Sequence, residues 1–185
     1  MKIEVIIPVS TDKWTDSVRA ECNQVKRPET LIDIISLSQG PEAIQSEYDE
    51  AKSAPYVLKE VANSQHKGYH AIIIYCFSDP GLSGAREISP IPIVGIGESS
   101  QLFAMGLADR IGIITTLDQS VARIRRKLLA RRISDRFNSI RALNIPVLEY
   151  DQKEKVLERA LDVASLLVKQ DGAEALILGC GSLLG

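Results

Sequence analysis

The chain has 185 residues, of which 45% are hydrophobic and 25% are charged, a balance typical of a globular protein that buries a core. Its formal net charge of -2 gives no overall field that would attract nucleic acid or an acidic membrane surface. Every apolar run is shorter than the roughly 18–20 residues that span a bilayer, and the first residues lack the cleavage site of a signal peptide. The three cysteines are an odd number without short spacings, which argues against a disulfide framework and a zinc site and favours a reducing cytoplasm.

Apolar runs alternate with amphipathic stretches along the chain. The apolar runs predict strands at 3–9, 31–37, 71–76, 91–96, 110–115, 145–150 and 175–180. The amphipathic stretches predict helices at 14–26, 43–66, 98–107, 118–132 and 151–170. Several apolar runs are continuous, as expected of parallel strands that are buried on both faces. This alternation of strand and helix predicts an α/β protein whose parallel sheets are covered by helices on both faces.

Two distant segments carry the same pattern. The segment GYHAIIIYCFS at 68–78 aligns with GAEALILGCGS at 172–182, so that Cys76 and Cys180 occupy equivalent positions. The predicted first strand of each half also ends in two hydroxyl residues. These pairs are Ser10-Thr11 and Thr115-Thr116. Each half thus presents hydroxyls after its first strand and a Cys-x-Ser after its third.

The repeat predicts two pseudo-symmetric three-layer α/β domains, at 1–97 and 98–185. The first half has a fourth strand after its cysteine strand, whereas the second half ends soon after Cys180. A matching strand and helix would need about 40–50 more residues, so we expect the second domain to be incomplete at its end. If the halves face each other about a pseudo-twofold axis, the two thiols approach one cleft from opposite sides.

Both thiols are predicted at the carboxyl ends of parallel strands, where α/β proteins bind their ligands. The N-terminus of a following helix would favour the thiolate and lower the pKa of each cysteine. Two acid/base groups on opposite sides of one carbon suit racemisation or epimerisation without a cofactor, because one thiolate removes a proton and the other thiol returns one to the opposite face. The candidates for stabilising the carbanion through hydroxyl or backbone N–H groups are Ser10, Thr11, Ser78, Thr115, Thr116 and Ser182.

Other interpretations of the cysteines stay open. A buried cysteine often serves as a small apolar residue in a core, and we take Cys22, which has no counterpart in the repeat, to be structural. A redox disulfide between Cys76 and Cys180 fits less well, because the repeat supplies separate domains rather than a resolving pair.

Three further features point away from other functions. The basic stretch 118–132 is a candidate anion or nucleic-acid patch, but no aromatic residues interleave with its charges, so we expect a solvated helix face. His66 and His70 have no acidic or cysteine partner nearby, so no metal site is predicted. The glycines at 95–97 lack the third glycine of a dinucleotide-binding fingerprint, so NAD is not expected.

Several sequence segments together resemble those of the aspartate/glutamate/hydantoin racemase family. They are SQGPEAIQSEYDEAKSAP (38–55), YCFSDPGLSGARE (75–87), PIVGIGESS (92–100), IGIITTLD (111–118) and LGCGS (178–182). The first cysteine motif is similar to the Cys-Phe-x-Asp-Pro-Gly of the hydantoin (allantoin) racemase branch. The resemblance covers essentially the whole chain. It implies two α/β domains with the active site between them, no cofactor, and Cys76 and Cys180 as the two bases.

The resemblance also implies which residues line the ligand pocket. These are Ser10, Thr11, Phe77, Ser78, Thr115, Thr116, Gly181 and Ser182. The amino-acid branches of the family usually show Cys-Asn-Thr and Cys-Thr, whereas this chain has Cys-Phe-Ser and Cys-Gly-Ser. An apolar Phe77 beside the base suits a neutral ring better than an α-amino dicarboxylate. The loop after the first strand departs from the Asn-Pro-Asn often found in hydantoin racemases, since it reads Pro8-Val9-Ser10 here.

We therefore expect a cytoplasmic, homo-oligomeric racemase of 5-substituted hydantoins or related cyclic ureides, with a small-molecule substrate, no metal and no cofactor. The enzyme alternative is an aspartate-type amino-acid racemase, or a related isomerase or decarboxylase that uses the same thiols. A dicarboxylate substrate would require a cation near the cleft loops, for which Lys13 and Arg86 are the candidates. The alternative of another class is a non-catalytic protein that binds a small molecule.

Overall fold

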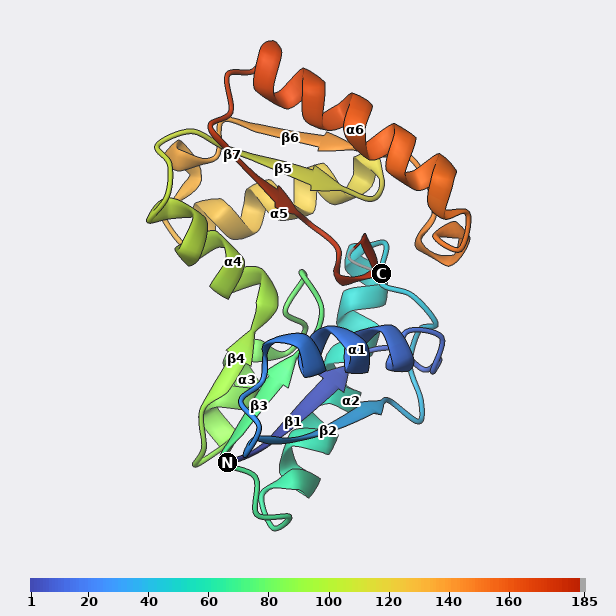
Figure 1. The fold of residues 1–185 in the computed structure, drawn as a ribbon. Helices are drawn as coiled ribbons and strands as arrows, with labels where there is room; N and C mark the ends of the chain where they lie inside the picture. The colour runs from blue at the N-terminus through green and yellow to red at the C-terminus, as the bar shows by residue number, and fades with distance from the viewer. Residues whose placement is uncertain (184–185) are drawn as a thin grey trace. The chain divides into compact units, whose positions relative to one another are not determined.

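Figure 1 shows the fold of the chain as a computed structural model, which describes residues 1–183. Residues 184–185, the end of the predicted second domain, lie outside the described residues. The chain divides into two compact units. Among the described residues, unit 1 contains Met1–Ile44 and Tyr48–Glu98, and unit 2 contains Gln45–Glu47 and residues 99–183. Each unit is built around its own parallel β-sheet.

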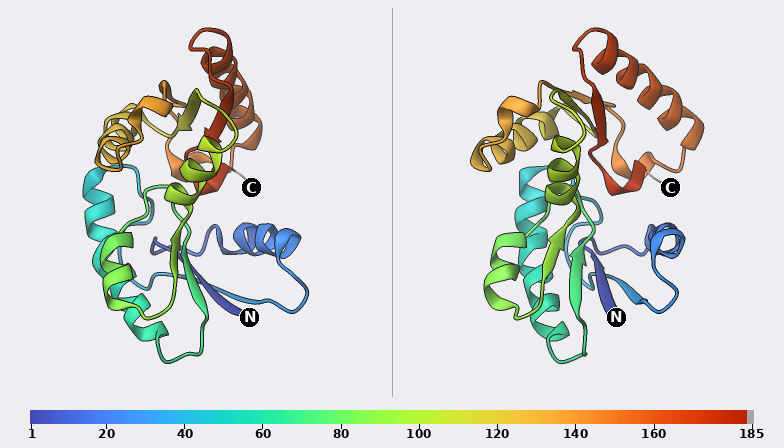
Figure 2. Two further views of the ribbon diagram at one scale, coloured as in Figure 1. Left: turned by 90° about the vertical axis from the view of Figure 1, so that its left-hand side faces the viewer. Right: turned by 60° about the vertical axis from the view of Figure 1, so that its left-hand side comes forward.

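The sheet of unit 1 has four parallel strands in the order β2-β1-β3-β4. The strands are β1 (Lys2–Ile7), β2 (Leu31–Ser36), β3 (Ala71–Ile74) and β4 (Ile93–Gly95). Helix α1 (Thr15–Val25) covers one face of this sheet, and α2 (Glu47–Ser64) and α3 (Leu82–Ile88) cover the other, as both views of Figure 2 show. The chain passes into unit 2 within α4 (Ile96–Met105).

The two faces of β1 explain its continuous apolar run. Val5 packs with Val18 of α1, whereas the next residue, Ile6, packs with Val57 of α2. Successive side chains of a strand point to opposite faces, so a strand covered by helices on both sides needs apolar residues at nearly every position. Glu4 is the exception to this apolar pattern, since it is a charged residue whose side chain is fully buried in the same strand.

The sheet of unit 2 has three parallel strands in the order β6-β5-β7. The strands are β5 (Ile111–Thr115), β6 (Ser139–Ala142) and β7 (Ala175–Leu178). Helix α5 (Asp118–Ala130) lies on one face and α6 (Lys153–Lys169) on the other (Figure 2). Short 3-10 turns are η1 (Ser134–Arg136), η2 (Val147–Glu149) and η3 (Gly181–Leu183). All five residues of the central strand β5 are buried.

The predicted strand at 145–150 is wrong. That segment contains the turn η2, and the strand beside β5 is β6, at Ser139–Ala142. Pro146 has no N–H to give to a sheet, and the N–H of Val147 donates to the side chain of Gln45 (2.8 Å) instead of to a strand. Strand β6 lies at the edge of the sheet and alternates half-buried and buried residues, so it lacks the continuous apolar run of the central strands.

The predicted fold class is confirmed. Each of the other predicted strands and each predicted helix overlaps an observed one, and α3 is a short helix that the sequence pattern missed. The arrangement is α/β, with parallel sheets that carry helices on both faces. Within residues 1–183, none of the helices combines the length and apolar character needed to cross a membrane.

Candidate active site

Cys76 follows the carboxyl end of β3 in unit 1. The N–H of the preceding Tyr75 still donates to the carbonyl of Ile6 in β1 (2.8 Å), so the sheet fixes the chain up to the cysteine. The thiol side chain is half-buried and packs against the apolar cluster between β1 and α1. The carbonyl of Cys76 accepts the N–H of Asp79 (2.9 Å), which closes a tight turn directly after the cysteine. Phe77 and Ser78, inside this turn, are both buried.

Asp79 ties the Cys76 turn to the start of α4. Its two carboxylate oxygens accept the N–H groups of Gly97 (2.9 Å) and Glu98 (2.7 Å). The first N–H groups of a helix have no partner inside the helix, so a buried carboxylate is a favourable acceptor there. Gly97 is required for this approach, because a Cβ at that position would lie 2.0 Å from the carbonyl oxygen of Phe77. The turn that carries the thiol is therefore anchored at both ends.

The hydroxyl residues after β1 are held by the loop that follows β2. Ser10 donates its hydroxyl to the carbonyl of Gly40 (3.1 Å) and its N–H to the carbonyl of Pro41 (2.9 Å). The hydroxyl of Thr11 accepts the N–H of Lys13 (3.3 Å). Because β1 and β3 are adjacent in the sheet, these two residues and the Cys76 turn all follow the carboxyl ends of neighbouring strands.

Cys180 takes the equivalent place in unit 2, after β7. The N–H of Gly179 donates to the carbonyl of Ile114 in β5 (2.7 Å), and the thiol is half-buried against the cluster that contains Tyr150. Burial raises the pKa of the Cys180 thiol, while the hydrogen bonds of Ser182 and the charge of Arg123 lower it in part.

The expectation that a helix N-terminus lowers the pKa of each thiol is wrong for Cys180. Burial has the larger effect there, and the segment after Cys180 is the short turn η3 rather than an α-helix. After Cys76, helix α3 begins only at Leu82, beyond the turn that Asp79 closes. The local sequence does not reveal how deeply a thiol is buried, so it could not predict the direction of this pKa.

The remaining predicted residues of unit 2 lie at the same edge of its sheet. Thr115 and Thr116, at the end of β5, are buried, and the hydroxyl of Thr116 lies 3.2 Å from the hydroxyl of Ser120 in α5. Gly181 and Ser182 form η3, directly after Cys180. Each unit thus gathers its own share of the predicted residues at the carboxyl ends of two adjacent strands. That they contact a ligand stays a prediction.

Arg123 is a residue near the site that sequence reasoning missed. The expectation of a solvated face for the basic stretch 118–132 is wrong at this position, because Arg123 is only 6% exposed. Its guanidinium donates to the carbonyl of Ser46 (2.9 Å) and to the hydroxyl of Ser120 (3.4 Å). The signal in the sequence is helical spacing, since Arg123 shares the buried side of α5 with Ser120, Ile124 and Leu128.

Of the two cations considered for binding a dicarboxylate substrate, Arg86 is paired with a carboxylate and Lys13 is exposed. Arg86 donates to the carboxylate of Glu98 (2.5 Å) and to the carbonyl of Ile93 (3.1 Å) in unit 1. Within residues 1–183, no group of three or more His, Cys, Asp or Glu side chains is arranged to hold a metal ion.

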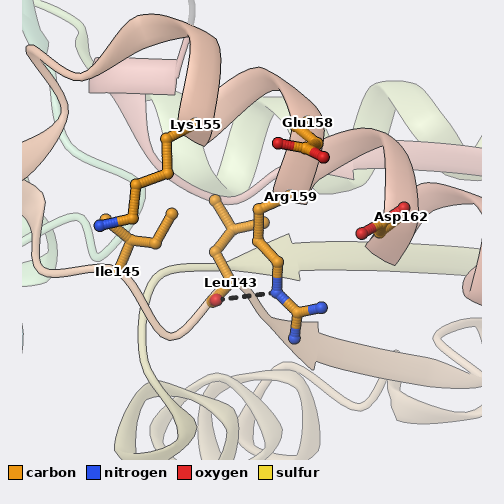
Figure 3. Close-up of a pocket in the computed structure, with 6 residues that line it drawn as sticks. All are labelled: Leu143, Ile145, Lys155, Glu158, Arg159 and Asp162. Atoms are coloured by element: carbon orange, nitrogen blue, oxygen red, sulfur yellow. Dashed lines mark hydrogen bonds between the residues drawn. The ribbon is translucent and has the colours of Figure 1, made fainter.

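Two pockets on unit 2 lie apart from the predicted residues. One of about 320 Å³ is lined by Leu143, Ile145, Lys155, Glu158, Arg159 and Asp162. Figure 3 shows the Nε of Arg159 donating to the carbonyl of Leu143 (3.1 Å), with Glu158 and Asp162 projecting from the same helix. The other, of about 470 Å³, runs along the edge strand β6 between α5 and α6. Neither is lined by a cysteine or by any predicted ligand contact.

Comparison with known proteins identifies the family. The family model described as Asp/Glu/Hydantoin racemase matches residues 3–185. The chain belongs to this family. It is therefore an enzyme of the isomerase class, similar to hydantoin and allantoin racemases.

Three relatives show the degree of similarity. A hydantoin racemase of Pseudomonas sp. (strain NS671) is 34% identical over 184 residues, which cover 99% of this chain and 74% of that protein. The structure of an allantoin racemase from Klebsiella pneumoniae superposes with a TM-score of 0.90 at 30% identity, covering all of this chain and 76% of that one. The allantoin racemase of Pseudomonas fluorescens gives a TM-score of 0.94 at 27% identity, covering all of this chain and 79% of that one. The family predicted from the cysteine motifs is confirmed.

Proposed function

We propose that this chain racemises 5-substituted hydantoins or related cyclic ureides, with Cys76 and Cys180 as the two bases. The observation that carries the proposal is the equivalent position of the two thiols, each after the carboxyl end of the strand next to the first strand of its sheet. The names of the relatives, a hydantoin racemase and two allantoin racemases, support the choice of substrate class.

The chemistry needs only a proton to move in and a proton to move out. The C5–H of a hydantoin lies beside a ring carbonyl, so the electron pair left by deprotonation delocalises onto that carbonyl oxygen. One cysteine enters the step as thiolate and takes the C5 proton, while the other enters as thiol and gives its proton to the opposite face of C5. After the step the two sulfurs have exchanged protonation states, and the next substrate of opposite hand resets them.

The buried turn after Cys76 also favours a neutral substrate. Phe77 and Ser78 are buried in unit 1, and Arg86 is bound to Glu98 rather than free to meet a carboxylate. A neutral ring loses less hydration free energy than a dicarboxylate on entering such surroundings.

The test is racemisation of single enantiomers in D₂O. The chain is incubated with each enantiomer of a 5-substituted hydantoin, and optical rotation and the C5–H proton signal are followed against a reaction without enzyme. We expect both signals to decay faster with enzyme. Cys76→Ser and Cys180→Ser should each lose racemisation, and the matched control Cys22→Ser, which changes the cysteine in α1, should keep it.

The single-cysteine variants give a sharper test of the two-base assignment. The remaining thiolate can still remove and return a proton on its own side, so each variant should exchange deuterium into one enantiomer only, and the two variants should prefer opposite enantiomers. Full racemisation by either variant, or racemisation of L-aspartate but not of any hydantoin, would refute the proposal. Tight binding of a hydantoin without exchange would favour a non-catalytic binding protein.

A further inference from the structure

Tyr150 of unit 2 carries a buried hydroxyl. The residue follows η2 in unit 2 and is 6% exposed. Its hydroxyl oxygen has no hydrogen-bond partner among the described residues. Buried polar atoms in folded proteins nearly always have a partner, and leaving one without a partner is unfavourable. The orphaned hydroxyl of Tyr150 therefore calls for an explanation beyond packing.

The sulfur of Cys180 is the polar group that shares its surroundings. The ring of Tyr150 packs in the apolar cluster formed by Ile114, Val163 and Leu167, and the Cys180 side chain packs against that same cluster. Burial and the negative charge that Cys180 can carry both raise the pKa of Tyr150. The phenol therefore keeps its proton and remains able to donate a hydrogen bond within the cluster against which Cys180 packs.

The other groups near the sulfur are also donors or cations. The N–H and the hydroxyl of Ser182 interact with the thiol, and Arg123 of α5 acts on it through its charge. Ser182 and Arg123 favour the thiolate, whereas burial against the cluster that contains Tyr150 favours the thiol. These opposing influences suit a group that must hold and release a proton in turn.

We propose that Tyr150 is a positioning residue that acts through Cys180, its hydroxyl donating a hydrogen bond to the sulfur whenever Cys180 is a thiolate. The inference rests on the proposed function, because it requires Cys180 to change protonation state. A thiol sulfur is a weak acceptor, which accounts for the unpaired hydroxyl in the described state. The hydrogen bond gains its full strength only when the charge forms, so it stabilises the state reached during proton transfer.

The test measures the thiolate of Cys180 directly. Cys22 and Cys76 are replaced by serine, so that Cys180 is the single thiol, and its rate of alkylation by iodoacetamide is followed from pH 6 to 11. Tyr150→Phe keeps the ring and removes only the hydroxyl. We expect it to shift the alkylation midpoint to higher pH and to slow alkylation below the midpoint by about tenfold, as expected for the loss of one hydrogen bond to a charged group. Tyr48→Phe, which changes a tyrosine that is 72% exposed, should cause no shift.

A stability measurement separates this role from a packing role. Removing an unpaired buried hydroxyl should leave the urea midpoint of Tyr150→Phe unchanged or slightly higher. Tyr150→Leu, which also lacks the hydroxyl, should shift the alkylation midpoint in the same direction. An unchanged alkylation midpoint in Tyr150→Phe, or an equal shift in Tyr48→Phe, would overturn the inference.

Racemisation kinetics distinguish the two proposals. If the parent chain racemises hydantoins, the pH profile of kcat for Tyr150→Phe should shift in the same direction as its alkylation profile. If the parent chain racemises no hydantoin but the alkylation shift is present, the proposed function fails while the interaction between Tyr150 and Cys180 stands. Racemisation by the parent chain without an alkylation shift leaves the proposed function intact and refutes the role of Tyr150.

Discussion

Replacing Asp79 tests whether the Cys76 turn depends on its anchor to α4. The carboxylate is 5% exposed and accepts the first N–H groups of α4, from Gly97 and Glu98. The backbone of Asp79 is also in the left-handed region, at a φ of 49°. Asparagine and aspartate tolerate this region better than other residues with a side chain. Asp79→Ala removes both hydrogen bonds and this tolerance, whereas Asp79→Asn keeps the tolerance and one good acceptor.

The expected cost follows from these contacts. Losing a helix-capping side chain costs about 0.5–2 kcal/mol, and losing the favourable charge at the helix N-terminus costs about 0.3–1 kcal/mol more. A left-handed alanine adds about 1–2 kcal/mol. We therefore expect the free energy of unfolding to fall by about 2–5 kcal/mol in Asp79→Ala. In Asp79→Asn the backbone contribution is absent and one acceptor remains, so the fall should be about 1–2 kcal/mol.

Urea unfolding followed by circular dichroism measures both values, and alkylation of Cys76 in a chain without Cys22 and Cys180 reports on the turn itself. The order of the two variants is the decisive result. If Asp79→Ala is no less stable than Asp79→Asn, or if either variant leaves the chain as stable as the parent, then the carboxylate does not anchor the turn and the reasoning is refuted.

Three further predictions concern pH and packing. The guanidinium of Arg141 and the hydroxyl of Ser139 lower the pKa of Asp171 from 3.8 to about 2. The stabilising contribution of the Asp171 carboxylate is therefore complete above pH 3.8 and is lost as the pH falls toward 2. Asp171→Asn should remove this part of the acid transition when Tm is measured over a pH series. Burial raises the pKa of Glu4 above 4.5 although Lys67 Nζ lies 3.9 Å from its carboxylate, so the free energy of unfolding should fall as the pH rises past 4.5. Glu4→Leu should abolish that pH dependence. It should also raise the free energy of unfolding at pH 7, measured by urea titration, by about 1–4 kcal/mol. Leu167→Ala, at a fully buried position of α6, should lower the urea-derived free energy of unfolding by about 2–5 kcal/mol, and a loss below 1 kcal/mol would contradict the assigned core.

The strands that lead to the cysteines could be predicted because their apolar runs are continuous. AIII in β3 and ALIL in β7 read as apolar runs, and each run leads directly to its cysteine. The edge strand β6, with its alternating Ser-Ile-Arg-Ala, gives a weaker signal over only four residues. The strand was therefore predicted at the nearby Ile-Pro-Val run instead.

The electrostatics of the site could not be predicted in the same way. Arg123 lies on the buried side of α5, but the carbonyl that accepts from it belongs to Ser46, which is far away along the chain. The pKa of Cys180 depends on how deeply the thiol packs against the cluster around Tyr150. The hydrogen-bond partner of Arg123 and the depth of the Cys180 thiol both depend on packing between distant segments, which no local pattern records.

The segment Gln45–Glu47 has a consequence for how the protein can be dissected. Gln45 and Ser46 directly precede α2 of unit 1, and Glu47 is its first residue. All three nevertheless group with unit 2, where Ser46 accepts from Arg123 and Gln45 accepts from Val147. Unit 2 is therefore not a contiguous stretch of chain. A gene fragment starting at Ser99 would omit the acceptors for a buried guanidinium and for a backbone N–H. During synthesis, Ser46 leaves the ribosome well before α5, so its contact with Arg123 can form only after that helix has been made.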